Sequence, residues 1–367
     1  MQRLTQLDVI RGFAVLGLLV MNAPFFGLFE HGYVSAVPTH WLDTYLHAFT
    51  LAAVDGRFRT LFCLLFGVAV AIQASKINGL ARVQARNHAL IALGLIHGFL
   101  IWAGDILFVY GCAGLLLANC VEHTGERNLR RGLGLLFAIS GVLGLAVAIE
   151  PPLELTRSSE TFQNDYARIY ASLTSLYLDN LKNAFFMTLL VPFLTLWYTF
   201  AVMRIGLGAW QLGWFHSLLP TRVFIIGSVL ALLFTALTLA LAFSGVALYK
   251  ALSEALNWLS ALFFAVPVVQ LLLYLARTQH LFAQILAPVG RVALTCYLTQ
   301  SVIGVLCFRV FFPHWVLTFD YIDYYLFSAV VVTTQVLVAH LYLSYFRQGP
   351  CEWLLARWLK QANVAEK

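Results

Sequence analysis

The sequence predicts an all-α fold, a polytopic membrane bundle of about ten transmembrane helices. Two observations predict it. Of the 367 residues, 61% are hydrophobic and only 11% are charged, and the apolar residues gather in long runs. A soluble domain of this length needs more charge to cover its surface. We therefore expect residues 1–367 to form a single integral membrane domain, and the net charge of +6 does not indicate a nucleic-acid partner.

Ten segments are long and apolar enough to be interpreted as spans: 9–29, 45–75, 87–104, 106–121, 132–150, 183–203, 223–248, 255–276, 291–311 and 324–346. The second is interrupted by three charges and a glycine between Val54 and Arg59. The pattern predicts a helix over 41–53, a break, and a second helix over 60–75. Irregular backbone at membrane depth needs protein or a wet cavity to satisfy it, so we expect the break to face a cavity.

Lysine and arginine residues are distributed unevenly over the loops. With the N-terminus inside and the spans alternating, most of them fall on the inner side. This bias predicts that both termini are cytoplasmic. Residues 151–182 are then an extracytoplasmic loop, in which 166–181 has the pattern of an amphipathic surface helix. Residues 349–367 are expected to form an amphipathic tail on the cytoplasmic surface.

Ionisable side chains inside a membrane are costly, so each is a candidate for function. Asp8 and Arg11 lie three residues apart on one helix face and can pair, either as a structural ion pair or with Arg11 near the phosphates of a donor. At the break, Asp55, Arg57 and Arg59 leave a net positive site that suits an anion. Alternatively, the arginines extend to an interface while Asp55 caps the following helix.

Two histidines are candidate general bases. His97 in the third span could be oriented by the carboxylate of Asp105, or it could be a packed histidine bonded to a neighbouring helix. Eight residues of straight helix rise about 12 Å, so we expect no contact between these two along one straight helix. His47 precedes the break and could lean over the cavity mouth, or it could simply be solvated.

Other polar residues within the apolar runs are weaker candidates. Asn22 in the first span could hydrogen-bond across helices, and Arg291 and Gln300 in the ninth lie nine residues apart on similar faces. The six cysteines have no CxxC spacing, so we expect packing residues and no metal site. P-loop, HExxH and GxSxG patterns are absent, so we do not expect nucleotide hydrolysis.

Short motifs along the whole chain match one family pattern in order. They are Leu7-Asp8-Val-Ile-Arg11-Gly12, Gly56-Arg57-Phe58, His97-Gly98, Gly104-Asp105-Ile106-Leu107, Gly290-Arg291-Val-Ala-Leu, and Gly349-Pro350 followed by Glu352-Trp353. The set resembles the YeiB-type family of multi-pass bacterial membrane proteins of unknown function. The resemblance implies a location in the bacterial cytoplasmic (inner) membrane.

That family in turn resembles the transmembrane acyltransferase superfamily, in particular its heparan glucosamine N-acetyltransferase-like branch. The resemblance implies that acyl-CoA enters from the cytoplasm and that a histidine serves as base or acyl carrier. The O-acetylating branch has its histidine where this chain has Asn22, so that histidine is missing. His47-Ala48, leading to Asp55, is similar to the histidine segment of the heparan branch.

Three functions from different classes are therefore expected. The leading one is a membrane acyltransferase that uses acetyl-CoA or a longer acyl-CoA. Arg11 and Arg57 would hold negative charge, His97 or His47 would be the base, and Asp105 would orient it. The second is a transporter or lipid flippase with a charged midplane site, and the third is a non-catalytic scaffold or sensor. Expected partners are membrane lipids, the acyl donor and an unidentified acceptor, with a homodimer left open.

Overall fold

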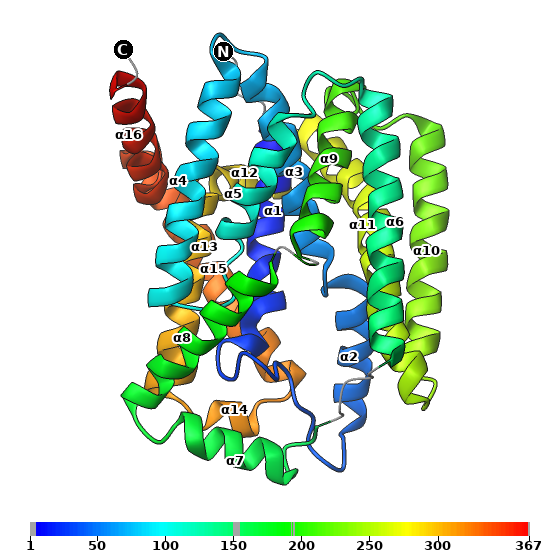
Figure 1. Cartoon of the computed structure of the whole chain (residues 1–367), viewed down its shortest axis with the longest axis vertical. Helices are drawn as coiled ribbons and strands as arrows, with labels where there is room; N and C mark the ends of the chain where they lie inside the picture. The colour runs from blue at the N-terminus through cyan, green and yellow to red at the C-terminus, as the bar shows by residue number, and fades with distance from the viewer. Residues whose placement is uncertain (1–4, 150–154, 192, 194, 366–367) are drawn as a thin grey trace.

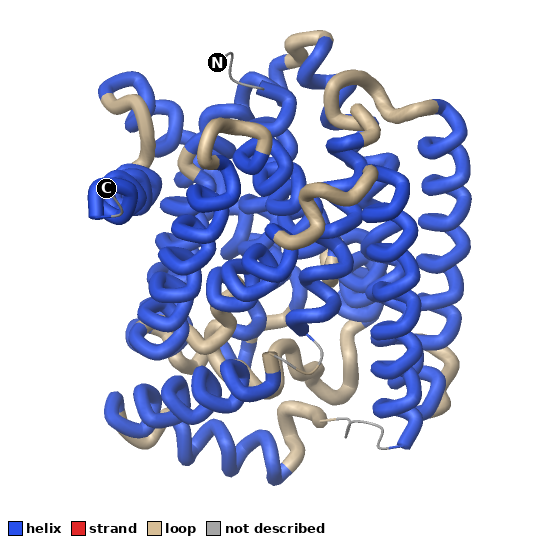
Figure 2. Tube along the Cα trace, turned by 45° about the horizontal axis from the view of Figure 1, so that its top comes forward, coloured by secondary structure: helices blue, strands red, loops and turns tan. Residues whose placement is uncertain are grey.

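The computed structural model describes residues 5–149, 155–191, 193 and 195–365 as a bundle of helices with loops gathered at its two ends (Figures 1 and 2). The helices are α1 (Thr5–Asn22), η1 (Ala23–Phe25), α2 (Trp41–Ala53), α3 (Arg57–Ala74), α4 (Gly79–Leu100), α5 (Leu107–Ala118), α6 (Gly125–Ile149), α7 (Glu160–Ile169), α8 (Leu173–Leu190), α9 (Thr195–Gln211), α10 (Thr221–Ala242), α11 (Ala247–Arg277), α12 (Leu281–Arg291), α13 (Ala293–Val305), the π-helical turn η2 (Leu306–Phe311), α14 (Trp315–Thr318), α15 (Tyr321–Tyr345) and α16 (Pro350–Ala365). Among the described residues there is no strand, so the predicted all-α fold is confirmed.

Two ends of the bundle are distinguished below. The upper end in Figure 1 holds the start of α1 and the whole of α16, and the lower end holds α7 and α14. The seven described segments that are long and apolar enough to cross a membrane are Thr5–Phe25, Trp41–Ala74, Gly125–Ile149, Thr221–Ala242, Ala247–Arg277, Ala293–Phe311 and Tyr321–Tyr345. An eighth is obtained if the bent pair α8 and α9 is counted as one span. The predicted membrane bundle is confirmed, whereas the count of ten is not. The fourth predicted span, for example, contains only the 12 residues of α5.

The predicted break in the second span is confirmed. Helix α2 ends at Ala53 and α3 begins at Arg57. Gly56 between them has φ +73°, a left-handed conformation that glycine adopts without steric cost. The main-chain N–H of Arg57 donates to the carbonyl of Val54 (3.1 Å), so the break is a hydrogen-bonded turn. The direction of the chain therefore changes inside the bundle without leaving this N–H unpaired.

Two predicted segments differ from the structure. The span predicted over 183–203 is divided, because α8 ends at Leu190 and α9 begins at Thr195. The sequence has a proline at position 192, which cannot donate to a helical ladder and disfavours helix in the residue before it. The helix predicted over 166–181 is also two helices. Helix α7 ends at Ile169, and the hydroxyl of Ser172 then caps α8 by accepting from the N–H of Ser175 (3.0 Å).

The core of the bundle lies around α1, which contacts α3, α11, α12, α13 and α15. Glycines let its backbone approach α12 closely. A Cβ added at Gly290 would lie 1.8 Å from the main-chain oxygen of Asp8, and one added at Gly12 would lie 2.2 Å from that of Leu286. Small residues allow this separation between membrane helices. The contact fixes the start of α1 against the end of α12.

The approach of α1 to α12 predicts a sharp effect of one methyl group. Gly290→Ala should lower the free energy of unfolding by about 1–3 kcal/mol, because overpacking forces backbone shifts. The midpoint of thermal unfolding of the detergent-solubilised protein measures this. Gly134→Ala in α6 is the matched control, since a Cβ there meets nothing within 4 Å. Equal midpoints for the two variants would contradict the packing argument.

Candidate functional site

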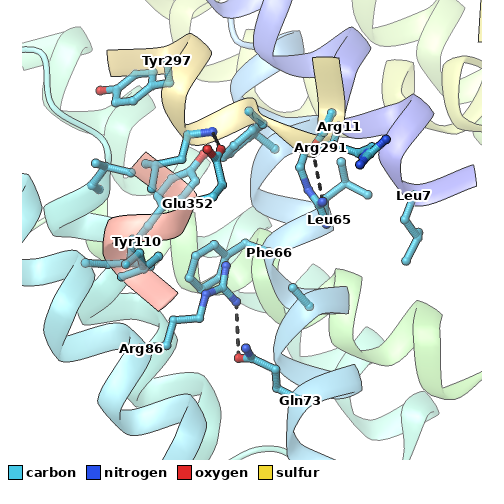
Figure 3. Close-up of a pocket in the computed structure, with 18 of the residues that line it drawn as sticks. Leu7, Arg11, Leu65, Phe66, Gln73, Arg86, Tyr110, Arg291, Tyr297 and Glu352 are labelled. Carbon is cyan, nitrogen blue, oxygen red and sulfur yellow. Dashed lines mark hydrogen bonds between the residues drawn. The ribbon is translucent and has the colours of Figure 1, made fainter. Parts of the chain in front are cut away.

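A cavity of about 350 Å³ lies near the upper end of the bundle, between α1, α3, α4, α5, α12, α13 and α16; we call it the upper cavity (Figure 3). Three arginines from three helices, Arg11, Arg86 and Arg291, contribute to its wall. Its other lining residues are mainly apolar, including Leu90 and Leu107. A cavity of this size with a few charged groups on an otherwise apolar wall is typical of a small-molecule site.

Each of the three arginines is anchored differently. Arg11 donates to the carboxylate of Asp8 (3.1 Å) and to the carbonyl of Gly290 (3.4 Å), so the predicted contact of Asp8 with Arg11 is present. Arg86 donates to Gln73 (3.4 Å) and lies over the ring of Phe66 (4.7 Å to the centroid).

The third arginine, Arg291, donates to the carbonyl of Arg347 (3.1 Å), while its buried Nε has no partner among the described residues. The structure thus brings Arg11 and Arg291 to one cavity. The structure adds Arg86 to this cavity. In the sequence, Arg86 is only one of the lysines and arginines that fall on the inner side.

Glu352 is a further member of this site that sequence reasoning missed. Its carboxylate accepts from the N–H groups of Leu294 (2.7 Å) and Thr295 (3.2 Å) and from the Thr295 hydroxyl (2.6 Å). It therefore occupies the N-terminus of α13, where the helix dipole favours negative charge. Glu352 also lines the upper cavity and ties α16 to it. The signal in the sequence was the Gly349-Pro350 motif, which ends two residues before Glu352.

His97 and Asp105 are in direct contact, contrary to the expectation for a straight helix. Helix α4 ends at Leu100 and the chain turns back, so that Nδ1 of His97 lies 2.9 Å from the Asp105 carboxylate. The second carboxylate oxygen accepts from the N–H of Phe108 at the start of α5 (2.7 Å). Nε2 of His97 is buried and has no hydrogen-bond partner among the described residues. A carboxylate on one ring nitrogen with the other free is the arrangement of an oriented base.

Tyr297 stands between this histidine and the upper cavity. Tyr297 lines the cavity, and its ring centroid lies 5.4 Å from that of His97. Its hydroxyl accepts from the N–H of Ile106 (3.1 Å), which lies in the turn after α4. His97 itself is not among the cavity-lining residues.

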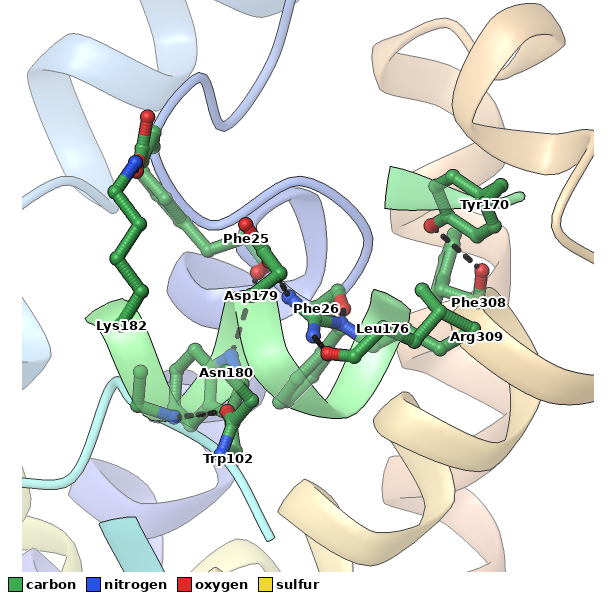
Figure 4. Close-up of polar contacts among 12 residues, drawn as sticks. Phe25, Phe26, Trp102, Tyr170, Leu176, Asp179, Asn180, Lys182, Phe308 and Arg309 are labelled. Carbon is green, nitrogen blue, oxygen red and sulfur yellow. Dashed lines mark hydrogen bonds and ion pairs between the residues drawn. The ribbon is translucent and has the colours of Figure 1, made fainter. Parts of the chain in front are cut away.

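The turn that carries Asp105 is held by α8 from outside (Figure 4). The side chain of Asn180, 4% exposed, accepts from the N–H of Ala103 (2.9 Å) and donates to the carbonyls of Gly98 (3.1 Å) and Phe99 (3.2 Å). These three backbone groups of the reversal and both polar atoms of the amide are therefore paired. We infer that Asn180 fixes the reversal that brings Asp105 back to His97.

The neighbouring residue on α8 forms a buried ion pair. Asp179 accepts from Arg309 of η2 (3.3 Å), and both side chains are buried. Arg309 also donates to the carbonyls of Phe26 (3.0 Å) and Leu176 (3.3 Å). Figure 4 shows Asp179 and Asn180 turned toward different neighbours. Helix α8 thus joins the turn after α1, the reversal after α4 and the end of α13.

A second cavity, of about 330 Å³, lies toward the lower end between α1, η1, α2, α11 and α15; we call it the lower cavity. His47 and Asp55 line it, as predicted for residues beside the break, together with Glu254, which sequence reasoning missed. The ring of His47 stacks on that of Tyr321 (5.5 Å between centroids, 14° between planes). Glu254 carried a simple signal, because it is an acid directly before the eighth apolar run, 255–276.

Tyr33, which also lines the lower cavity, lies in the loop before α2. Burial raises its pKa above the usual range, and the hydrogen bond that it donates to Asp43 adds to this effect. The phenol therefore stays protonated at physiological pH and remains a fixed donor to Asp43.

Neither arginine of the break lines either cavity. Arg57 is 1% exposed and donates to Asn257, to the Ser260 hydroxyl (2.7 Å) and to the main-chain carbonyl of Asp55 (2.7 Å). Arg59 lies over the ring of Tyr198 (5.2 Å to the centroid). Burial of Arg57 does not agree with the alternative in which the arginines extend to an interface. Arg57 joins the break to α11.

Asn22 and Gln300 likewise lie away from the cavity walls. Asn22 is buried at the end of α1. Gln300 donates to the carbonyl of Val15 (3.2 Å) and to the side chain of Gln335 (2.8 Å), so it joins α13 to α1 and α15. Among the residues that the structure describes, no three His, Cys, Asp or Glu side chains are arranged to hold a metal ion.

The role of Asn180 leads to a stability prediction. Asn180→Ala leaves two carbonyls and one N–H of the reversal unpaired, at a cost of about 1–3 kcal/mol for each buried group. We expect the midpoint of thermal unfolding in detergent to fall by several degrees. Asn164→Ala on the exposed surface of α7 is the control and should leave the midpoint unchanged. An unchanged midpoint for Asn180→Ala would mean that other contacts hold the turn.

Comparisons with known proteins identify relatives along the whole chain. The family model described as "Protein of unknown function (DUF418)" matches residues 209–362. The chain is 30% identical to "Uncharacterized protein YeiB" of Escherichia coli (strain K12), over 96% of this chain and 95% of that protein. It is 25% identical to "Uncharacterized protein YxaH" of Bacillus subtilis (strain 168), over 100% and 97% of the two chains.

A third relative, "Uncharacterized 39.9 kDa protein in amylase 3'region" of Bacillus acidopullulyticus, is 27% identical over 96% of this chain and 92% of its own length. Because identity reaches 30% over nearly the full length of both proteins, the chain belongs to the YeiB-type family of membrane proteins of unknown function.

Proposed function

We propose that the chain is a membrane acyltransferase that takes its acyl group from a cytoplasmic acyl-CoA. The upper cavity is the observation that carries this proposal. Its wall combines Arg11, Arg86 and Arg291 with apolar side chains. Coenzyme A carries phosphate groups at one end and the acyl thioester at the other. Guanidinium groups bind phosphates through strong charge-assisted hydrogen bonds, and an apolar depth suits the acyl chain.

The positive-inside distribution supports a cytoplasmic opening for this cavity. Its three arginines come from the helix ends that the sequence assigns to the inner side. A donor from the cytoplasm would then enter at the upper end, with its phosphates among the arginines. The carboxylate of Glu352 lies at the same wall. It would have to keep its hydrogen bonds to the N-terminus of α13, so that the phosphates bind to the arginines and away from it.

His97 is the proposed general base. Asp105 holds Nδ1 of the ring, which leaves Nε2 to take a proton. The hydroxyl or amine of the acceptor attacks the thioester carbonyl carbon and its proton passes to Nε2. The bond from carbon to sulfur breaks, and the departing thiolate takes the proton. Tyr297 lies between His97 and the cavity, so its ring has to turn before the thioester can reach Nε2.

A transporter or lipid flippase is the second candidate, favoured by the two cavities at opposite ends. Phe62 on α3 lines the upper cavity, and Asp55 in the break before α3 lines the lower one. Between them the ring of Phe58 packs on Gly17 of α1, where an added Cβ would lie 2.0 Å from it. Phe58 and Gly17 thus separate the upper cavity from the lower one. Alternating access requires a barrier of this kind between two sites that open to opposite sides of the membrane.

The donor site predicts a dependence on Arg86. Arg86→Gln removes one charged donor from the cavity and should weaken binding of acetyl-CoA and octanoyl-CoA roughly 10-fold to 100-fold. Isothermal titration of the purified protein measures the effect. Arg130→Gln on the exposed side of α6 is the control and should bind like the unchanged protein. If neither acyl-CoA binds the unchanged protein, the enzyme proposal fails and transport becomes the leading function.

The base predicts a different kinetic effect. His97→Gln should lower the rate of acyl transfer about 100-fold to 10,000-fold while leaving the affinity for acyl-CoA unchanged. Transfer from radiolabelled acetyl-CoA to membrane components in proteoliposomes provides the readout. His88→Gln, on the exposed side of the same helix, should retain full transfer. Undiminished transfer by the His97 variant would exclude the histidine as base, and His47 would then be tested in its place.

A further inference from the structure

We infer that the lower cavity binds a ligand that carries an ammonium group, either a free organic cation or the headgroup of a lipid. The inference does not rest on acyl transfer, since that proposal assigns no ligand to this cavity. It starts from the charges on the wall. Asp55 and Glu254 line the cavity, and none of the described lining residues is lysine or arginine.

These two carboxylates are poorly satisfied by the protein. One oxygen of Asp55 accepts from Asn257 (2.9 Å). Glu254 forms no hydrogen bond or ion pair with any described residue, although it lies on the membrane-spanning helix α11. A charge inside a span is costly unless something pairs with it. A cationic ligand between the two carboxylates would supply that partner.

Three nearby cationic side chains are engaged with other groups. Arg57 donates to the main-chain carbonyl of Asp55 and not to its carboxylate. Arg157 pairs with Asp320 (2.9 Å). His31, which lines the cavity, lies 3.0 Å from Asp165. Hydrogen bonds from Arg168 and His31 lower the pKa of Asp165, so this acid stays ionised and keeps His31 engaged.

Aromatic rings form a further part of the wall. Tyr33, Tyr321, Tyr324, Tyr325 and Phe25 all line the cavity. The face of an aromatic ring attracts an ammonium group, and cages of such rings bind quaternary ammonium ligands. Carboxylates beside several rings therefore favour an organic cation over a hydrated metal ion. A neutral polyol would leave the negative charge of Glu254 without a counter-charge.

Two tyrosine hydroxyls point independently to a ligand. Tyr321 is 8% exposed and Tyr324 is 5% exposed, yet neither hydroxyl hydrogen-bonds with any described residue. The other two tyrosines of the wall are satisfied, Tyr33 by Asp43 and Tyr325 by Thr50. Both residues line the lower cavity, where a ligand can reach these hydroxyls. The oxygens of Tyr321 and Tyr324 can accept from N–H groups or contact the methyl groups of an ammonium ligand.

The test measures protection of Glu254 from a carbodiimide that modifies carboxylates. The full chain is reconstituted in phosphatidylglycerol nanodiscs and modified with or without choline at constant ionic strength. The modified peptides are then quantified by mass spectrometry. Choline should slow modification of Glu254 several-fold. Its neutral isostere 3,3-dimethyl-1-butanol should not. Glu160, exposed on α7, is the internal control and should react equally in all samples.

A second arm separates the two sources of the ammonium group. If the ligand is a lipid headgroup, Glu254 should react more slowly in phosphatidylcholine nanodiscs than in phosphatidylglycerol nanodiscs, without added choline. If it is a free cation, only added choline should protect. Asp55→Asn should weaken either protection, and its thermal unfolding midpoint shows whether the variant is folded.

The inference is overturned if choline and its isostere protect equally, or if neither choline nor phosphatidylcholine slows modification of Glu254. Because the readout does not involve acyl-CoA, either result leaves the proposed enzyme function to be judged by its own experiments.

Discussion

The close approach of α1 to its neighbours is the constraint on which both cavities depend. Gly12 and Gly290 bring α1 against α12, and Gly67 and Gly206 bring α3 against α9, where an added Cβ would lie 1.9 Å and 2.1 Å from a main-chain oxygen. In a bilayer, packing and not water drives helix association, so small residues determine which helices meet. The contact of α1 with α12 sets Arg11 beside Arg291, and the central position of α1 lets it contribute to both cavities.

The break between α2 and α3 shows how a charge can be kept inside the bundle. Arg57 is fully buried, and its partners are the carbonyl of Asp55 and the side chains of Asn257 and Ser260 on α11. A buried charge is tolerated when hydrogen bonds surround it. By joining the turn to α11, Arg57 places Asp55 on the wall of the lower cavity. An arginine that the sequence suggested as an anion-binding group is thus primarily a link between helices.

The contact between His97 and Asp105 depends on a helix far away in sequence. Helix α8 supplies Asn180, which hydrogen-bonds with the backbone groups that would otherwise be unpaired in the reversal after α4. The adjacent Asp179 anchors α8 through Arg309. An oriented base needs a rigid support if its geometry is to be held. Asp179 and Asn180, near the middle of α8, provide that support from outside the two cavities.

The sequence by itself determined the helical membrane class, the break near Gly56 and the pairing of Asp8 with Arg11. Each of these follows from composition, from local backbone preference or from spacing along one helix. Only the tertiary structure decided that Asp105 returns to His97, that Arg86 and Glu352 join Arg11 at one cavity, and that Glu254 faces Asp55. Those contacts join segments far apart in the chain or depend on where a helix ends. Helical periodicity describes which residues share a face, but it does not specify which face meets which helix.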